Sequence, residues 1–133
     1  MSVRILVVDD EADVEMLFRQ QFRRELREKR FVMDFALSAA DALAFLKAAP
    51  GGADLILILS DINMPGMTGL ELLPRIRAMR PALPVIMITA YGDAETRRRA
   101  HEAGASGLLT KPVDFPVLKG EIEARVAASS AAS

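Results

Sequence analysis

Residues 3–10 read Val3-Arg4-Ile5-Leu6-Val7-Val8-Asp9-Asp10, an apolar run that ends on two carboxylates. Three later runs have the same form, because each is largely apolar and leads into a residue whose side chain can contact a phosphoryl group. They are Leu55–Ser60 before Asp61, Pro84–Ile88 before Thr89, and Gly107–Thr110 before Lys111. The carboxyl ends of parallel strands meet at one edge of an α/β sheet. These polar residues are therefore expected to converge at one point.

Segments of helical period separate the apolar runs, which is the pattern of repeated βαβ units. Phe31–Leu37 is predicted to be the second strand. Five helices are predicted: over about 11–29, from the N-cap Ser38 to a turn at 50–52, over about 69–79, over about 93–103, and from the N-cap Asp114 to about Val126. Five strands and five helices in strict alternation predict an α/β protein with a flavodoxin-like, doubly wound, five-stranded parallel sheet in the order 2-1-3-4-5. Residues 1–128 would form this domain, and residues 129–133 a frayed C-terminal tail.

The composition bounds the class of protein. The chain has 133 residues, 51% hydrophobic and 26% charged, which suits one ordinary core. A net charge of −1 argues against nucleic-acid binding driven by net charge. The absence of cysteine and the single histidine, His101, exclude disulfides, thiolate sites and multi-histidine metal sites. Because the sequence has neither a signal-peptide pattern nor an apolar run long enough to cross a bilayer, a cytoplasmic location is expected.

The carboxylates indicate a metal site. Asp9 and Asp10 follow the first strand and Asp61 follows the third, and these strands are neighbours in the predicted order. Carboxylates crowded together repel one another unless a cation lies between them. Oxygen ligands without histidine or cysteine favour a hard ion such as Mg²⁺. Asp9 and Asp10 alone could simply cap the first helix, but that alternative leaves Asp61 unexplained.

Asp61 is the best candidate for a nucleophile, because a carboxylate can attack a phosphoryl donor and form an acyl phosphate. Since one anion then attacks another, positive charge is needed, and Mg²⁺ and Lys111 would supply it. Thr89 can donate a hydrogen bond to a phosphoryl oxygen. Taken singly, Thr89 is an ordinary strand end and Lys111 a solvated loop lysine. Only their placement together with the acids indicates a site.

Four motifs together carry a resemblance to a known family. They are Val7-Val8-Asp9-Asp10-Glu11, Asp61-Ile62-Asn63-Met64-Pro65-Gly66-Met67-Thr68-Gly69, Ile88-Thr89-Ala90 and Thr110-Lys111-Pro112. Over about residues 3–126 the chain resembles the receiver domain of two-component response regulators. Each motif alone is a weak signal, whereas the combination is very specific.

The resemblance implies a function for the acids. Asp61 would accept a phosphoryl group from a phosphohistidine on a sensor histidine kinase. Asp10 and Asp61 would ligate Mg²⁺ by their side chains, Asn63 by its backbone carbonyl, and Asp9 through water. The protein would be no enzyme beyond catalysing its own phosphorylation and slow dephosphorylation.

The resemblance also implies roles around the phosphoryl group, with one departure. Thr89 and Lys111 would hold the phosphoryl oxygens, and the small Ala90 would leave access to the site. The Lys111–Pro112 peptide bond is expected to be cis. Receivers commonly carry tyrosine or phenylalanine three residues before the lysine, as a switch on the output face, whereas this chain has Leu108. The usual coupling between the threonine and an aromatic ring therefore cannot operate in that form.

Output is expected through protein–protein contacts or a phosphorelay, because too few residues follow Val126 for an effector domain. The downstream partner would dock on the face made by helix 93–103, strand 106–110 and the last helix, with Arg97-Arg98-Arg99 at its rim. A solvated helix face is the alternative interpretation of these arginines. Tyr91 would either cover the site or pack halfway onto the next helix. A dimer linked to phosphorylation also remains open.

Two other functions on this fold are disfavoured. Aspartyl-phosphate hydrolases usually need an aspartate two residues after the nucleophile as acid and base, and here that position is Asn63. Flavin or nucleotide carriers need a phosphate-cradling loop after the first strand. This chain has Asp9-Asp10-Glu11 there, which would repel a phosphate that carries no metal.

Overall fold

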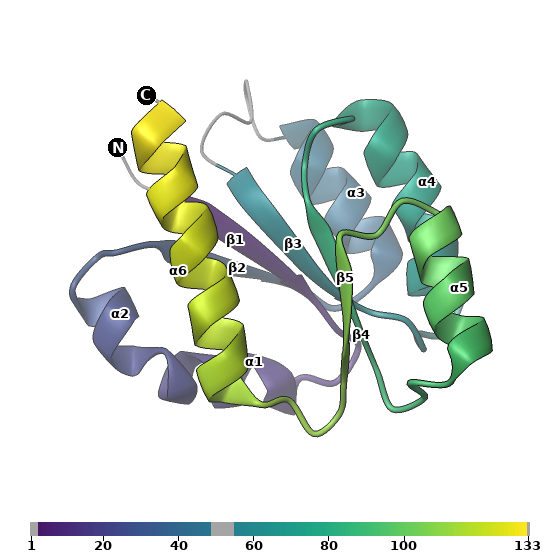
Figure 1. Cartoon of the computed structure of the whole chain (residues 1–133), viewed down its shortest axis with the longest axis horizontal. Helices are drawn as coiled ribbons and strands as arrows, with labels where there is room; N and C mark the ends of the chain where they lie inside the picture. The colour runs from purple at the N-terminus through teal and green to yellow at the C-terminus, as the bar shows by residue number, and fades with distance from the viewer. Residues whose placement is uncertain (1–2, 49–54, 133) are drawn as a thin grey trace.

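One parallel sheet organises the structure, a computed structural model that describes residues 3–48 and 55–132. Its strands are β1 (Arg4–Val8), β2 (Val32–Ala36), β3 (Leu55–Asp61), β4 (Val85–Thr89) and β5 (Gly107–Thr110). The described helices are α1 (Asp13–Gln21), α2 (Arg23–Arg27), α3 (Ala39–Ala48), α4 (Gly69–Met79), α5 (Ala94–Glu102) and α6 (Phe115–Ala132). The strand order is β2-β1-β3-β4-β5 with every neighbouring pair parallel, which confirms the predicted topology (Figure 1).

The ends of two predicted segments need comment. The turn predicted at 50–52 lies outside the described residues. Helix α6 is described as far as Ala132, so its backbone enters the stretch assigned to a frayed tail, and the domain boundary at 128 stays a prediction. Among the described residues, no helix is long and apolar enough to cross a membrane.

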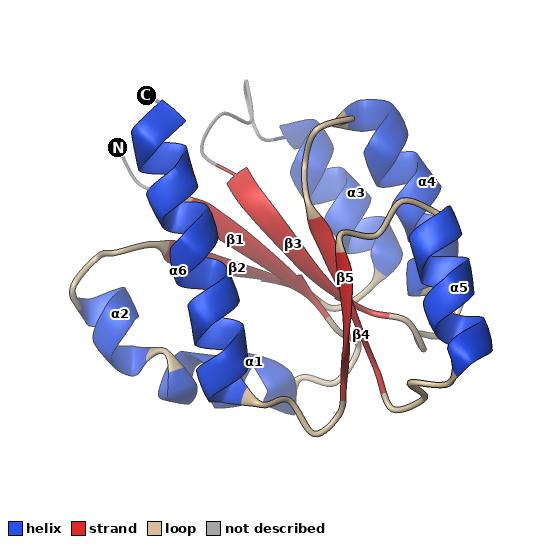
Figure 2. Cartoon of the chain, in the orientation of Figure 1, coloured by secondary structure: helices blue, strands red, loops and turns tan. Residues whose placement is uncertain are grey.

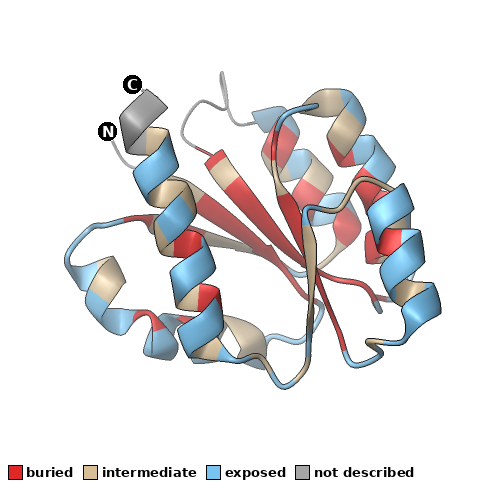
Figure 3. Ribbon diagram, viewed as in Figure 1, coloured by how far each residue is buried: buried red, intermediate tan, exposed pale blue. Residues whose placement is uncertain are grey.

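Helices cover both faces of the sheet, with α3, α4 and α5 on one side and α1, α2 and α6 on the other (Figure 2). Side chains alternate along β1, where Leu6 and Val8 enter the first core cluster and Ile5 and Val7 enter the second. Because both faces are covered, the central strands are buried along their length, as Figure 3 shows in red. This explains why their sequences are continuous apolar runs instead of alternating ones.

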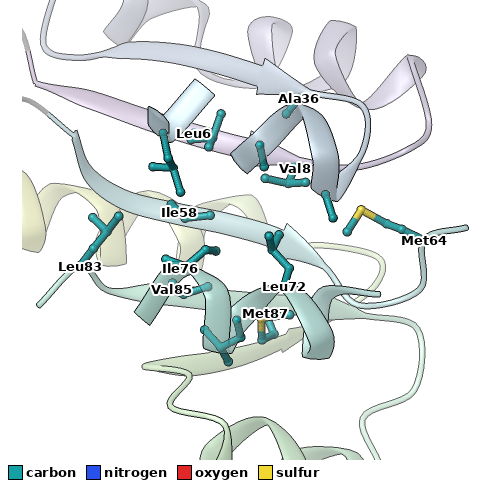
Figure 4. Close-up of a cluster of buried hydrophobic side chains, with 14 of the residues drawn as sticks. Leu6, Val8, Ala36, Ile58, Met64, Leu72, Ile76, Leu83, Val85 and Met87 are labelled. Atoms are coloured by element: carbon teal, nitrogen blue, oxygen red, sulfur yellow. The ribbon is translucent and has the colours of Figure 1, made fainter. Parts of the chain in front are cut away.

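The first cluster reaches from the sheet to the loop that follows the acceptor strand. Figure 4 shows Ile58 of β3 beside Leu72 and Ile76 of α4, with Met64 at one end of the cluster. Met64 is only 5% exposed although it belongs to the loop after β3. Burial of this side chain anchors the loop on the core, and it thereby fixes the backbone that leaves Asp61.

The first helix differs from the prediction of one helix over about 11–29, so the described chain has six helices instead of five. The break is at Phe22, whose torsion angles φ −105° and ψ 18° leave the helical range. Its ring is buried and packs against the rings of Phe18, Phe31 and Phe115. The hydrogen bonds from Phe22 N to Phe18 O and from Leu26 N to Phe22 O both remain. The aromatic contacts therefore coincide with a bend in the backbone that a pattern of apolar spacing does not reveal.

One arginine of α4 ties together the two loops that lead into β4 and β5. The Arg77 side chain on α4 donates to the backbone carbonyl of Gly104 at 3.2 Å from Nε and 2.6 Å from Nη2. Its Nη1 donates to the carbonyls of Leu83 and Pro81. Gly104 has a φ of +101°, and a Cβ there would lie 3.1 Å from Arg77 Nε. The guanidinium thus joins the C-terminus of α4, the entry to β4 and the end of α5.

We expect Arg77→Met to lower the free energy of unfolding by roughly 1–3 kcal/mol, because partly buried carbonyls lose their donors. Urea denaturation monitored by circular dichroism would measure the change. Arg75→Met on the same helix is the matched control, since Arg75 is exposed and makes no such contacts. Its effect should stay within about 0.5 kcal/mol. Equal effects of the two substitutions would contradict a bracing role for Arg77.

Candidate functional site

The structure brings three carboxylates together at the carboxyl edge of the sheet. One carboxylate oxygen each from Asp9, Asp10 and Asp61 lies within 4.8 Å of the other two. Asp9 is 7% exposed and Asp61 is 4% exposed, whereas Asp10 is open to solvent. The pairing of β1 with β3, which places Val8 opposite Ser60, brings the two strand ends into register. The sequence predicted this convergence but not which of the acids are buried.

Backbone donors fix the two buried carboxylates. Asp9 Oδ1 accepts from Glu11 N at 2.9 Å, and Asp61 Oδ1 accepts from Asn63 N at 3.3 Å. One oxygen of each acid is therefore held by its own loop. The other oxygen, Oδ2, is left for a cation.

Lys111 supplies the positive charge of the site. Its Nζ lies 3.4 Å from Asp9 Oδ2 and 3.4 Å from Asp61 Oδ2. A third carboxylate, Oε1 of Glu11, lies 3.9 Å away, which the sequence analysis did not predict. The ammonium arrives from β5 across the sheet and is shared between two acids, so neither has a cation of its own.

Burial and charge shift the pKa values in this cluster. Burial raises the pKa of Asp61 above its ordinary value, and repulsion from Asp9 raises it further, while Lys111 and the Asn63 N–H oppose the rise. For Lys111, burial lowers the pKa, but attraction by Asp9 and Asp61 outweighs it, and the net shift is upward. The lysine therefore stays charged, while the acids are not fully compensated. A further cation would relieve the remaining repulsion.

Thr89 lies at the end of β4 and is completely buried. Its Oγ1 accepts from Asn63 Nδ2 at 3.3 Å and from Tyr91 N at 3.1 Å. The contact with the Asn63 side chain was missed from the sequence, which gave a role only to the Asn63 backbone carbonyl. A side-chain amide two residues after a strand end carries no signal in the sequence that would identify its partner.

Two backbone features shape the rim of the site. A Cβ on Gly69 would lie 2.3 Å from the backbone oxygen of Asp61, so only glycine allows α4 to begin this close to the acceptor strand. The Lys111–Pro112 peptide bond is cis, as the motif predicted. The residue after Thr89, Ala90, is exposed. The backbone is thus closely packed at Gly69, while the side chain that follows Thr89 is small.

The residues that the sequence analysis connected with output lie on β5, in the β4–α5 loop and on α5. Leu108 lies half-buried on β5 and packs against the first core cluster. Tyr91 is 66% exposed, so it is not the half-packed loop residue that one interpretation predicted. Arg97, Arg98 and Arg99 are all exposed on α5.

The structure is thus an α/β protein with three carboxylates and one ammonium gathered at the carboxyl edge of its parallel sheet. Comparison with known proteins gives its family, because the family model "Response regulator receiver domain" matches residues 5–123. The chain therefore belongs to the receiver domains of two-component response regulators, as its motifs predicted.

Individual relatives agree with this assignment. The chain is 33% identical to the response regulator RppA of Synechocystis sp., over 92% of this chain and 50% of the relative. It is 31% identical to sporulation initiation phosphotransferase F of Bacillus subtilis, over 92% of this chain and 93% of the relative. It is similar to the CheY-like receiver domain protein of Methanospirillum hungatei JF-1, with a TM-score of 0.83, 28% identity and 100% of both chains covered. Several curated relatives are longer, and the chain spans about half of RppA and 42% of the transcriptional regulatory protein ResD of Bacillus subtilis.

The raised pKa of Asp61 gives a stability prediction. The native state binds this proton more tightly than the unfolded chain, so stability falls as pH rises from the unfolded value of about 3.9 through the higher folded value. In chelator at neutral pH, Asp61→Asn should therefore raise the free energy of unfolding by roughly 0.5–2 kcal/mol. Below the unfolded pKa the gain should vanish, because Asp61 is then protonated in both states.

Urea denaturation at several pH values measures this dependence. Asp10→Asn should give a smaller gain, because Asp10 is exposed. Asp41→Asn on α3 is the control outside the cluster, where little change is expected. If Asp61→Asn instead lost stability at neutral pH, the pairing with Lys111 would outweigh the repulsion from Asp9.

Proposed function

We propose that this receiver accepts a phosphoryl group from a sensor histidine kinase or a phosphotransfer protein on Asp61, in a reaction that depends on Mg²⁺. The observation that carries the proposal is the shared ammonium: Lys111 Nζ lies 3.4 Å from oxygens of both Asp9 and Asp61. These oxygens attract positive charge, and the single charge of Lys111 does not neutralise both carboxylates. The site is arranged to gain stability from a metal ion and a phosphoryl group bound together.

The residues fit the metal. The side chains of Asp10 and Asp61, the backbone carbonyl of Asn63 and a water on Asp9 would supply the oxygen ligands that Mg²⁺ prefers. When bound, the ion would neutralise the negative charges of the attacking carboxylate and of the phosphoryl oxygens.

The chain's own groups then account for the transfer. A carboxylate oxygen of Asp61 attacks phosphorus, and a P–O bond forms as the P–N bond to the donor histidine breaks. The electron pair stays on the leaving imidazole nitrogen, which takes up a proton. Lys111 moves from the carboxylates onto a phosphoryl oxygen. Thr89 donates its O–H to another, because both of its acceptor positions are already occupied by Asn63 and Tyr91.

The side chain of Asn63 argues against the alternative of a phosphatase acting on other substrates. That chemistry needs an acid or base at this position, whereas the Asn63 amide has no titratable proton and donates to Thr89 Oγ1. The protein would therefore catalyse only its own phosphorylation and slow loss of the phosphoryl group.

An apolar cavity beside the site suits the phosphodonor. It has a volume of about 220 Å³, and Lys111, Pro112 and Val113 line one part while Val14 and Leu17 of α1 line another. Leu17 is an apolar residue of α1, yet its side chain is 43% exposed. An exposed apolar side chain next to the acceptor would contact the protein that brings the phosphohistidine.

Output would pass through protein contacts or onward phosphotransfer in the cytoplasm. Receivers of about this length occur among the relatives, since the chain covers 93% of sporulation initiation phosphotransferase F and 100% of the CheY-like protein. We place the downstream partner on the face made by α5, β5 and α6. A dimer formed on phosphorylation would be compatible with the same face.

The acceptor assignment predicts a labelling result. Incubation with a small acyl phosphate and Mg²⁺ should add one phosphoryl group that is stable in acid and lost in base. Mass spectrometry should locate it on Asp61, and both chelation of Mg²⁺ and Asp61→Asn should abolish it. Asp41→Asn, at an exposed position of α3 outside the acidic cluster, should label as the parent does. Retention of labelling in Asp61→Asn at the parent rate would refute the assignment.

Activation should move the β4–α5 loop. A phosphoryl group biases only the groups that contact it differently in the two states, and Thr89 leads directly into residues 90–93. Beryllofluoride, a mimic of the phosphoryl group, should change amide exchange in residues 90–93 and α5 and leave the strand around Leu108 nearly unchanged. The Asp61→Asn protein is the control, because it should not bind the mimic. Changes confined to α1, α2 and α3 would contradict this route.

A further inference from the structure

A hollow opens between α5 and β5, on the proposed output face. Its volume is about 180 Å³, and it is lined by Arg97, Ala100, His101, Ala105, Ser106, Gly107 and Leu108. Four of these residues are alanine, serine or glycine, so small side chains leave the space. A water molecule takes up about 30 Å³ in the liquid, and the hollow is therefore large enough for a side chain.

Positive charge lies at the edge of this hollow. Arg97 lines it, and the Arg97 guanidinium donates to the backbone oxygen of Gly92 at 3.0 Å. Within residues 3–48 and 55–132, Arg97 has no carboxylate partner. The neighbouring Arg98, in contrast, is held by Glu95 and Glu102 on the same helix. The charge of Arg97 is thus available to an anionic group that approaches from outside.

A short series of contacts connects the hollow to Thr89, which would hold a phosphoryl oxygen in the proposed function. Thr89 Oγ1 accepts from Tyr91 N at 3.1 Å, and the next residue, Gly92, accepts from Arg97 Nε at 3.0 Å. Gly92 also approaches β5 closely, because a Cβ there would lie 2.3 Å from Thr110 Cγ2. A shift of Thr89 towards a phosphoryl oxygen therefore displaces the loop that holds Arg97, and with it one wall of the hollow.

We propose that this hollow receives a bulky apolar side chain, best an aromatic ring, from the downstream protein partner, and that a carboxylate next to that side chain pairs with Arg97. An anchor side chain in a pocket with polar groups at its rim is the usual form of an energetic hot spot between proteins. The small lining residues make the space, and Arg97 decides the charge of the segment that enters. The proposal rests on the proposed function, since it assigns the partner chemistry of that output face.

Capped tripeptides are suitable probes of this chemistry. One carries phenylalanine between two aspartates, a second carries alanine in the middle, and a third places lysines around phenylalanine. Each is titrated into the full chain, with and without beryllofluoride, and amide shifts are followed by NMR. The acidic phenylalanine peptide should shift the amides of residues 97–108 in a saturable way. The alanine peptide should cause no saturable shifts. The lysine peptide should bind at least about two- to fivefold more weakly than the acidic phenylalanine peptide, because it cannot pair with Arg97.

Variants separate filling of the hollow from other effects. Leu108→Phe supplies a ring from within and should abolish binding of the acidic phenylalanine peptide. Met16→Phe is the matched control, because it adds the same ring on α1, which covers the opposite face of the sheet. It should leave binding unchanged. Arg97→Met should reduce the affinity for the acidic peptide to that of the lysine peptide.

The outcomes distinguish this proposal from the one on which it rests. Labelling of Asp61 by the small acyl phosphate is measured on the same samples. If Asp61 is labelled but the acidic phenylalanine peptide produces no saturable shifts, or binds equally well to Leu108→Phe, the docking pocket is wrong while the phosphoacceptor stands. Equal affinity with and without beryllofluoride would overturn the connection through Gly92 and Arg97. If Asp61 is not labelled, the proposed function itself fails.

Discussion

Two carboxylates held out of water beside one shared ammonium are the constraint on which the rest of this structure depends. At separations below 4.8 Å, repulsion between two carboxylates is of the order of a few kcal/mol at an effective dielectric constant near 20. A fold can maintain such an arrangement only if its backbone is fixed by interactions elsewhere. Adjacent parallel strands supply this rigidity, because β1 and β3 are buried on both faces and pair along their length.

The surrounding structure divides into a braced part and a loosely attached part. Met64 is buried under the loop after β3, Gly69 packs against the backbone of Asp61, and Arg77 ties α4 to two more loops. On the other side of the site, α5 buries only Ala100 and makes many of its contacts through exposed charges. Since few apolar contacts hold α5, its position costs less to change than that of α4. The part of the fold whose position is easiest to change is thus α5, on the side of Thr89.

The sequence predicted those features that arise from strand ends. Apolar runs locate the strands, and the parallel topology converts their ends into neighbours. Asp9, Asp10, Asp61 and Lys111 meet as expected, and Thr89 contacts the loop after Asp61 through Asn63. Features that arise from side-chain packing were not predictable in this way. The bend at Phe22 depends on rings from three segments, and the contact of Asn63 with Thr89 depends on a rotamer. The exposure of the apolar Leu17 was likewise not predictable, because that part of α1 borders a cavity next to Lys111 instead of the core.

Hydrogen-bond chemistry at Thr89 limits how a signal leaves a site that lacks the usual aromatic ring. A hydroxyl has one donor and two acceptor positions. Both acceptor positions are filled, by Asn63 and Tyr91, so only the O–H remains for a phosphoryl oxygen. Forming that new bond requires neither existing bond to break. If phosphorylation draws Thr89 towards a phosphoryl oxygen, as we propose, the Tyr91 amide would follow it instead of being released. The displacement would then pass along the backbone to Gly92 and to Arg97, which is bound to it. Under the proposed function, a backbone linkage would take the part of a rotating side chain, and Leu108 could stay in place while the loop moves.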